Sequence, residues 1–101
     1  MHAPAHIDAE VLSALGRLHR GGHVSIRAVS QRLRTLSAAP VLRHPLPQIL
    51  AGAWRRRSNL SLLDALYVEL AEVLHVPLVT TDRRLARATS KAEYVEASAE
   101  V

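Results

Sequence analysis

The sequence predicts an α/β protein with a short parallel sheet, and three observations support this. Residues 61–76 carry apolar side chains at helical spacing, and a short apolar run follows at residues 78–81, as expected for a helix leading into a buried strand. Along the rest of the chain, helical patterns alternate with short strand patterns, which is typical of parallel sheets. The segments between these patterns are short, so long connecting loops are not expected.

The bulk composition narrows the class of protein. With 101 residues, of which 49% are hydrophobic, the chain is expected to form one small domain. Cysteine is absent, which excludes a disulfide framework and zinc–thiolate sites. No apolar run approaches the roughly 18 residues that span a bilayer, and the first residues lack the layout of a signal peptide. A cytoplasmic protein without a membrane partner is therefore the expectation.

The formal net charge is +4, and 12 of the 13 basic residues are arginine. Arginine suits bidentate contacts with phosphate better than lysine does. An arginine- and alanine-rich composition also follows from GC-rich coding, so the charge alone leaves nucleic-acid binding and coding bias as two open explanations.

In the first half, residues 1–6 are either the end of a strand or a loose terminus. A helix is predicted over residues 7–19, ended by Gly21 and Gly22. A second helix is predicted over residues 25–36, with Ser25 as its N-cap. A strand at residues 41–44 and a short helix at residues 48–56 follow. The residues expected to face inward are Ile26, Val29, Leu33 and Leu36 in the second helix, and Ile49, Leu50, Ala53 and Trp54 in the third.

In the second half, Ser61 is the predicted N-cap of the main helix, which must stop before Pro77. Leu62 and Leu63 belong to its apolar stripe. The strand at residues 78–81 ends at Asp82, a short helix is expected over residues 83–89, and an edge strand at residues 93–95. The domain is expected to cover residues 1–95 and to leave 96–101 as a frayed tail.

Three acidic residues adjoin apolar anchors: Glu10, Asp64 and Asp82. If their carboxylates cluster, they need a cation, and a hard oxygen-ligated ion such as Mg²⁺ or Mn²⁺ relieves their repulsion. Such a site activates water for attack on a phosphodiester. Each acid also has an interpretation without metal. Asp64 completes a capping box with Ser61, Asp82 caps the helix after it, and Glu10 complements a helix dipole.

The acids lie in three blocks that resemble the motifs of a known family. The blocks are Ile-Asp-Ala-Glu-Val-Leu-Ser-Ala-Leu at residues 7–15, Asn-Leu-Ser-Leu-Leu-Asp-Ala-Leu-Tyr-Val-Glu-Leu-Ala-Glu at 59–72, and Pro-Leu-Val-Thr-Thr-Asp-Arg-Arg-Leu-Ala at 77–86. In this order and spacing they resemble PIN domains, and most closely the VapC-type toxins of bacterial toxin–antitoxin pairs. The resemblance covers nearly the whole chain from about residue 2.

The resemblance implies a three-layer α/β/α fold and a metal-dependent ribonuclease that cuts structured RNA such as tRNA or rRNA. It also implies a cognate antitoxin, a homodimer and Mg²⁺, with Mn²⁺ as the alternative ion. By motif, Glu10, Asp64 and Asp82 become catalytic metal ligands. The supporting residues are Asn59, Thr80 and Thr81, and the RNA-binding candidates are Arg55, Arg56, Arg57, Arg83 and Arg84. The run 55–57 also has a plain interpretation as a solvated loop.

The chain departs from the family pattern before Glu10. PIN domains begin with a buried strand that ends in an aspartate, some tens of residues before this helix, whereas nine residues precede Glu10 here. Asp8 is no substitute, because it belongs to the start of the helix. The sequence therefore resembles a PIN domain without its first strand and first catalytic Asp. It is interpreted as a start codon placed too late, a truncated remnant, or a fragment that another chain completes.

Three functional hypotheses follow. The first is a PIN-type endoribonuclease, the toxin of a type II toxin–antitoxin system, impaired by the missing strand. The second is a catalytically inactive remnant that binds an antitoxin or a second toxin chain. The third is a small basic helical nucleic-acid-binding protein, which the lack of a recognition-helix motif disfavours. Without its central strand, the chain is expected to be poorly soluble, molten or self-associated, with very weak nuclease activity.

Overall fold

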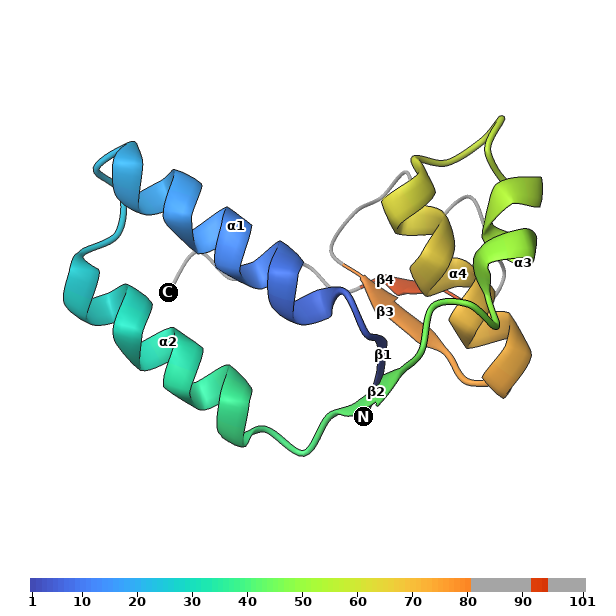
Figure 1. The fold of residues 1–101 in the computed structure, drawn as a ribbon, viewed down its shortest axis with the longest axis horizontal. Helices are drawn as coiled ribbons and strands as arrows, with labels where there is room; N and C mark the ends of the chain where they lie inside the picture. The colour runs from blue at the N-terminus through green and yellow to red at the C-terminus, as the bar shows by residue number, and fades with distance from the viewer. Residues whose placement is uncertain (81–91, 95–101) are drawn as a thin grey trace. The chain divides into compact units, whose positions relative to one another are not determined.

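The computed structural model describes residues 1–80 and 92–94. The chain divides into two compact units, residues 1–44 and residues 45–101, and each contains helices and a two-stranded parallel sheet (Figure 1). The α/β class predicted from the alternating patterns is confirmed. The assignment of residues 1–95 to one domain stays a prediction, as does the absence of a first strand.

In the first unit, two helices follow the first strand along the chain and precede the second, and the two strands pair with each other. Its elements are β1 (His2–Pro4), α1 (Ile7–Arg20), α2 (Ile26–Ala38) and β2 (Leu42–His44). The strands β1 and β2 run parallel, with His2 opposite Leu42. Parallel strands need a long crossover, and the pair α1 and α2, which lie side by side, supplies it (Figure 1). The open question about residues 1–6 is thereby answered, because they contain a strand.

The ends of these helices follow the predicted signals. The Ser25 hydroxyl accepts a hydrogen bond from the Ala28 N–H at 3.1 Å, as an N-cap should. After α1, Gly22 has a φ of +79°, a conformation that glycine adopts without steric cost. One expectation is wrong: Ile26 is 71% exposed, because it occupies the first turn of α2, and α2 has no fully buried residue.

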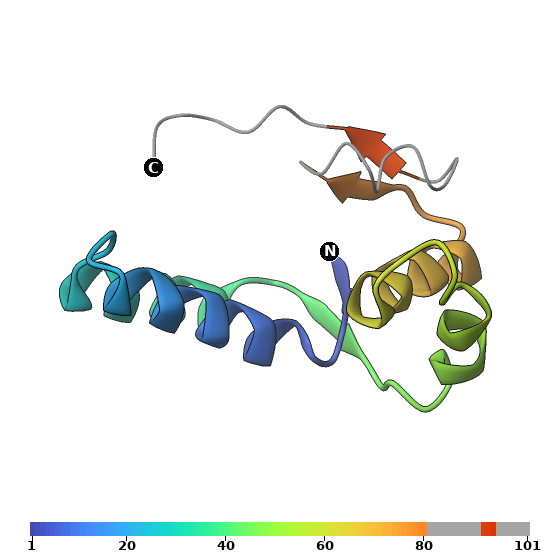
Figure 2. The same cartoon turned by 90° about the horizontal axis from the view of Figure 1, so that it is seen from above.

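The second unit is built on a helix pair and the sheet that follows it. Its elements are α3 (Leu50–Arg55), α4 (Leu62–Leu74), β3 (Leu78–Thr80) and β4 (Ala92–Tyr94). The strands β3 and β4 pair in parallel, and Figure 2 shows them side by side. The β3 strand covers the described part of the predicted run, Thr81 lies outside the described residues, and β4 begins one residue earlier than predicted. The helix predicted over residues 83–89 lies outside the described residues.

Both ends of α4 match the sequence signals. The Ser61 hydroxyl accepts a hydrogen bond from the Asp64 N–H at 3.2 Å. At the other end, His75 takes the left-handed conformation, with φ 55°, so the helix stops before Pro77 as expected. Non-glycine residues rarely adopt this conformation.

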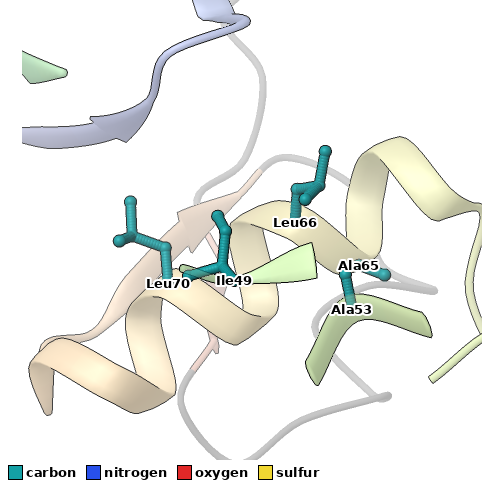
Figure 3. Packing of buried hydrophobic residues seen from close by; sticks show 5 residues of the cluster. All are labelled: Ile49, Ala53, Ala65, Leu66 and Leu70. Carbon is teal, nitrogen blue, oxygen red and sulfur yellow. The ribbon is translucent and has the colours of Figure 1, made fainter. Parts of the chain in front are cut away.

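The core of the second unit lies between α3 and α4. Its cluster is formed by Ile49, Ala53, Ala65, Leu66 and Leu70. Figure 3 shows Ala53 of α3 against Ala65 of α4, so two small residues let the helices approach closely. Full burial of an Ile or Leu side chain contributes about 1.5–3 kcal/mol, so this cluster is a main source of the unit's stability.

Two inward assignments in α3 are wrong. Leu50 and Trp54 are 52% and 56% exposed, whereas Ile49 and Ala53 are buried. Residues four apart share a helix face, and the next residue along is turned about 100° from it. Because Ile49 and Ala53 face α4, Leu50 and Trp54 point away from that contact. Among the described residues, no helix combines the length and apolarity needed to cross a membrane.

Candidate metal centre

Asp64 lies in the first turn of α4, where the capping-box interpretation can be tested. In a capping box, the acid at this position accepts a hydrogen bond from the backbone N–H of the N-cap residue. Here Ser61 caps the helix through its hydroxyl, but the Asp64 carboxylate accepts no hydrogen bond from a described residue. Among the described residues the cap therefore runs in one direction, from the Asp64 N–H to the Ser61 hydroxyl.

Glu10 lies in the first turn of α1, on the first unit. Its Oε1 is 3.0 Å from Nε2 of His6, one helical turn away, and about a third of its side chain is exposed. The pair positions the carboxylate at the start of the helix. This placement fits the dipole interpretation and also leaves a carboxylate at a helix N-terminus, as at Asp64.

Asp8, the other acid in the first turn of α1, has a structural partner. Arg43 of β2 donates from Nε to Oδ2 at 2.6 Å and from Nη2 to Oδ1 at 2.8 Å. These hydrogen bonds hold the pKa of the Asp8 carboxyl below its ordinary value, and they raise the pKa of Arg43. The bidentate pair ties α1 to β2, which agrees with leaving Asp8 out of the metal set.

The three arginines after α3 have different surroundings. Arg56 donates to Oε1 of Glu69 on α4 at 3.1 Å, so its charge is paired within the unit. Arg57 lies over the Trp54 ring, 4.8 Å from the centroid, and donates to the Trp54 carbonyl at 3.0 Å. Arg55 is exposed and has no ion-pair partner among the described residues. Arg55 and Arg57 are therefore better placed than Arg56 to hold phosphate.

The remaining predicted residues are less fully described. Asn59 is exposed in the turn before α4, where its N–H bonds to the Arg56 carbonyl at 3.1 Å. Thr80 is the last residue of β3. Thr81, Asp82, Arg83 and Arg84 lie outside the described residues.

The proposed ligands Glu10, Asp64 and Asp82 are all carboxylates, and this ligand type suits a hard metal ion. Within residues 1–80 and 92–94, no three His, Cys, Asp or Glu side chains are close enough together to hold a metal ion. Glu10 and Asp64 belong to different units, and Asp82 lies beyond the described part of the chain. Carboxylate oxygens are nevertheless the ligands that Mg²⁺ and Mn²⁺ prefer.

Comparison with known proteins decides the family. The PIN domain model matches residues 1–91. The chain belongs to the PIN domain family. Over 95 residues it is 57% identical to "Ribonuclease VapC3" of Mycobacterium tuberculosis, a match that covers 94% of this chain and 69% of that protein. No solved structure matches this chain.

More distant relatives of the PIN-domain chain bear the same kind of name. "Ribonuclease VapC9" of Mycobacterium tuberculosis is 37% identical over 86 residues, covering 85% of this chain and 68% of the relative. "VapC ribonuclease Mb0985" of Mycobacterium bovis matches with the same identity and coverage. The VapC-type resemblance inferred from the three sequence blocks is therefore confirmed.

The structure also shows residues whose roles the sequence did not predict. The side chain of Glu69 is largely buried, and it pairs with Arg56. A Cβ at Gly52 would overlap the Glu69 carboxylate, so this glycine leaves room for the pair. A glycine inside a short helix is the sequence signal for such a close approach.

Proposed function

We propose that this PIN-domain chain is the toxin of a type II toxin–antitoxin pair, a metal-dependent endoribonuclease whose metal ligands are Glu10, Asp64 and Asp82. The observation that carries the proposal is the Asp64 carboxylate at the N-terminus of α4, which accepts no hydrogen bond from the described residues and lies within the PIN domain match. A carboxylate kept only for capping would accept the N-cap N–H, and Asp64 does not.

The proposed roles follow the charges of the residues. The three carboxylates hold Mg²⁺, with Mn²⁺ as the alternative. When bound, the ion supplies an activated water and stabilises negative charge on the phosphodiester. Arg55 and Arg57 position the RNA backbone through phosphate contacts, and Arg83 and Arg84 join them. Asn59, Thr80 and Thr81 orient groups around the carboxylates by hydrogen bonding.

The proposal extends to partners and location. The substrate is a structured RNA of the tRNA or rRNA class, a cognate antitoxin holds the protein inactive in the cytoplasm, and the toxin forms a homodimer. These assignments rest on the sequence resemblance to VapC-type toxins and on the names of the relatives.

The test is cleavage of a labelled tRNA by the purified full chain with Mg²⁺, with Mn²⁺, and with EDTA. We expect weak cleavage, because the enzyme is expected to be impaired, and we expect EDTA to abolish it. Glu10→Gln, Asp64→Asn and Asp82→Asn should each lower the rate more than tenfold, since even outer-shell partners of a metal cost about 10–100-fold. Glu72→Gln, which changes an α4 acid outside the proposed set, is the matched control.

Thermal unfolding of each variant separates loss of activity from loss of fold. If the folded wild-type chain fails to cleave with either metal, the enzyme proposal is wrong, and an inactive module that binds an antitoxin or second toxin chain takes its place. If Asp64→Asn cleaves as fast as Glu72→Gln, Asp64 is not a metal ligand.

A further inference from the structure

Two histidine rings meet across the strand pair of the first unit. His2 of β1 and His44 of β2 are 42 residues apart in the chain, yet Nδ1 of His2 lies 2.8 Å from Nε2 of His44. The ring centroids are 5.0 Å apart, and the ring planes are tilted by 40° to each other. Two imidazole nitrogens from different strands therefore converge on one place, and neither residue belongs to the proposed carboxylate set.

The register of the strands explains why the rings meet. His2 lies opposite Leu42, and Pro4 lies opposite His44. Side chains alternate between the two faces of a sheet along each strand, so these four residues share one face and the two histidines are diagonal neighbours on it. Figure 1 shows β1 and β2 side by side, at the point where the chain returns after the helix pair. Pairing of the two strands is enough to bring the rings together.

The contact between the rings requires one nitrogen without a proton. A neutral imidazole has one N–H donor and one bare nitrogen that accepts, so one ring donates to the bare nitrogen of the other. A metal ion binds the same bare nitrogen, and imidazole is a common ligand of Zn²⁺, Cu²⁺ and Ni²⁺. When the donor ring carries its proton on its other nitrogen instead, both converging nitrogens are bare and one cation can bind the two of them.

The 2.8 Å separation suits two adjacent ligands of one ion. With metal–nitrogen bonds of about 2.0–2.1 Å, two ligands at right angles are about 2.9 Å apart, whereas two ligands of a tetrahedral ion are about 3.3 Å apart. Right angles between ligands are typical of Cu²⁺ and Ni²⁺, and the tetrahedral arrangement is typical of Zn²⁺. The two rings therefore need less movement to bind Cu²⁺ or Ni²⁺ than to bind Zn²⁺.

The charged groups beside the histidine pair do not occupy it. Arg43 precedes His44, but its side chain starts from the other face of β2, and its guanidinium donates to Asp8 at 2.6 Å. The amino group of Met1 lies 3.5 Å from the carbonyl oxygen of Pro40. The nearest cationic side chain along the strand is thus paired with a carboxylate, which reduces its repulsion of a bound cation.

We propose that His2 and His44 form a surface site for one divalent transition-metal ion, Cu²⁺ or Ni²⁺, whose remaining positions are filled by water. Within residues 1–80 and 92–94, no third His, Cys, Asp or Glu side chain completes a set of three. The ion would link β1 to β2 and close the segment that contains α1 and α2. Metal links that close long segments are expected to stabilise most, and α2 has no fully buried residue. Metal binding and the stability of the first unit are thereby coupled.

Calorimetric titration of NiCl₂ into the full chain tests the site. The chain carries no affinity tag, and excess Mg²⁺ is present to compete for carboxylates. We expect the wild-type chain to bind one Ni²⁺ at its tightest site. His2→Asn and His44→Asn should each weaken this binding at least about tenfold, because each removes one of the two ligands. His23→Asn, which changes an exposed histidine of the same unit, is the matched control and should leave the affinity unchanged.

Thermal unfolding followed by circular dichroism gives a second readout. Ni²⁺ at about ten times its Kd should raise the unfolding temperature of the wild-type chain by at least about 4 °C. The same Ni²⁺ concentration should leave the unfolding temperature of His2→Asn unchanged. Because His2 is exposed, His2→Asn should stay folded, and it decides the test even if His44→Asn does not fold.

Three results would overturn the proposal. The first is an equal Ni²⁺ affinity in the wild-type chain and His2→Asn. The second is an equal loss of affinity in His2→Asn and His23→Asn, which would show that Ni²⁺ binds histidines without regard to their pairing. The third is binding that Glu10→Gln removes and His2→Asn leaves intact, which would assign the ion to the carboxylates.

Discussion

The helices α1, α2 and α4 have 14, 13 and 13 residues, but the two units stabilise them differently. In the first unit, α1 buries Leu15 and α2 has no fully buried residue. In the second, α4 buries Ala65, Leu66, Val68, Leu70 and Ala71. In the first unit, Arg43 donates to Asp8, and ring nitrogens of His2 and His44 are 2.8 Å apart. The second unit adds one such contact to its apolar packing, between Arg56 and Glu69.

The difference shows that an apolar stripe alone does not make a helix part of a core. Leu12, Leu18 and Ile26 lie on α1 and α2 yet remain exposed, whereas Leu66 and Leu70 of α4 pack with Ile49 and Ala53 in one core cluster. Burial needs a partner surface at the right distance, and α3 supplies one through Ala53 and Gly52. Stability should therefore depend on packing in the second unit and on specific polar contacts in the first.

The largest expected effect is in the core of the second unit. Leu70→Ala should lower the free energy of unfolding by about 2–5 kcal/mol, because it removes buried methyl groups and leaves a cavity. Leu12→Ala, on an exposed leucine of α1, should change it by less than about 0.5 kcal/mol. Urea unfolding followed by circular dichroism measures both. Similar losses of unfolding free energy in the two variants would contradict the proposed difference between the units.

A smaller effect is expected where α3 meets α4. Gly52→Ala places a Cβ on the Glu69 carboxylate and should cost about 1–3 kcal/mol through overpacking. Glu69→Ala removes the obstruction but leaves Arg56 without its partner. The double variant should therefore lose less stability than the sum of the two single variants. Strict additivity in this double-mutant cycle would show that Gly52 is not required by Glu69.

The smallest effect concerns the tie between α1 and β2. The Asp8 pKa is lower in the folded chain, so the pair stabilises the fold fully above the unfolded value of about 3.9. That contribution disappears as the pH falls through the folded pKa. The stability of the Asp8→Asn variant should therefore fall less than that of the wild type as the pH is lowered. Salt should reduce the stability difference between the two proteins, because the pair is exposed. Thermal unfolding of both proteins from neutral to acid pH measures it, and identical acid profiles would contradict it.

Local signals in the sequence predicted much of this fold. Ser25 and Ser61 marked helix starts, Gly22 marked a helix end, and the proline at 77 marked the stop of α4. These features act within one or two turns of chain, so a single sequence contains them. The VapC-type family also followed from three short blocks.

Contacts between distant residues were not predictable in the same way. The Asp8–Arg43 pair joins residues 35 apart, and Arg56 reaches Glu69 across 13 residues. Helical periodicity predicted that Trp54 faces inward. It could not predict which face of α3 turns toward α4, and the packing of Ile49 and Ala53 sets that face. For the same reason, the convergence of Glu10, Asp64 and Asp82 stays a prediction, because it depends on all of the packing between their elements.

Binding of one Mn²⁺ ion, followed by NMR of the isotope-labelled full chain, tests the metal-centre proposal most directly. Mn²⁺ accepts the same oxygen ligands as Mg²⁺ and broadens the resonances of nearby nuclei. We expect substoichiometric Mn²⁺ to broaden amide signals around Glu10, Asp64 and Asp82 together, and Asp64→Asn to reduce all three effects in parallel. Broadening around Asp64 without Glu10, in a chain that remains folded, would contradict a shared metal centre.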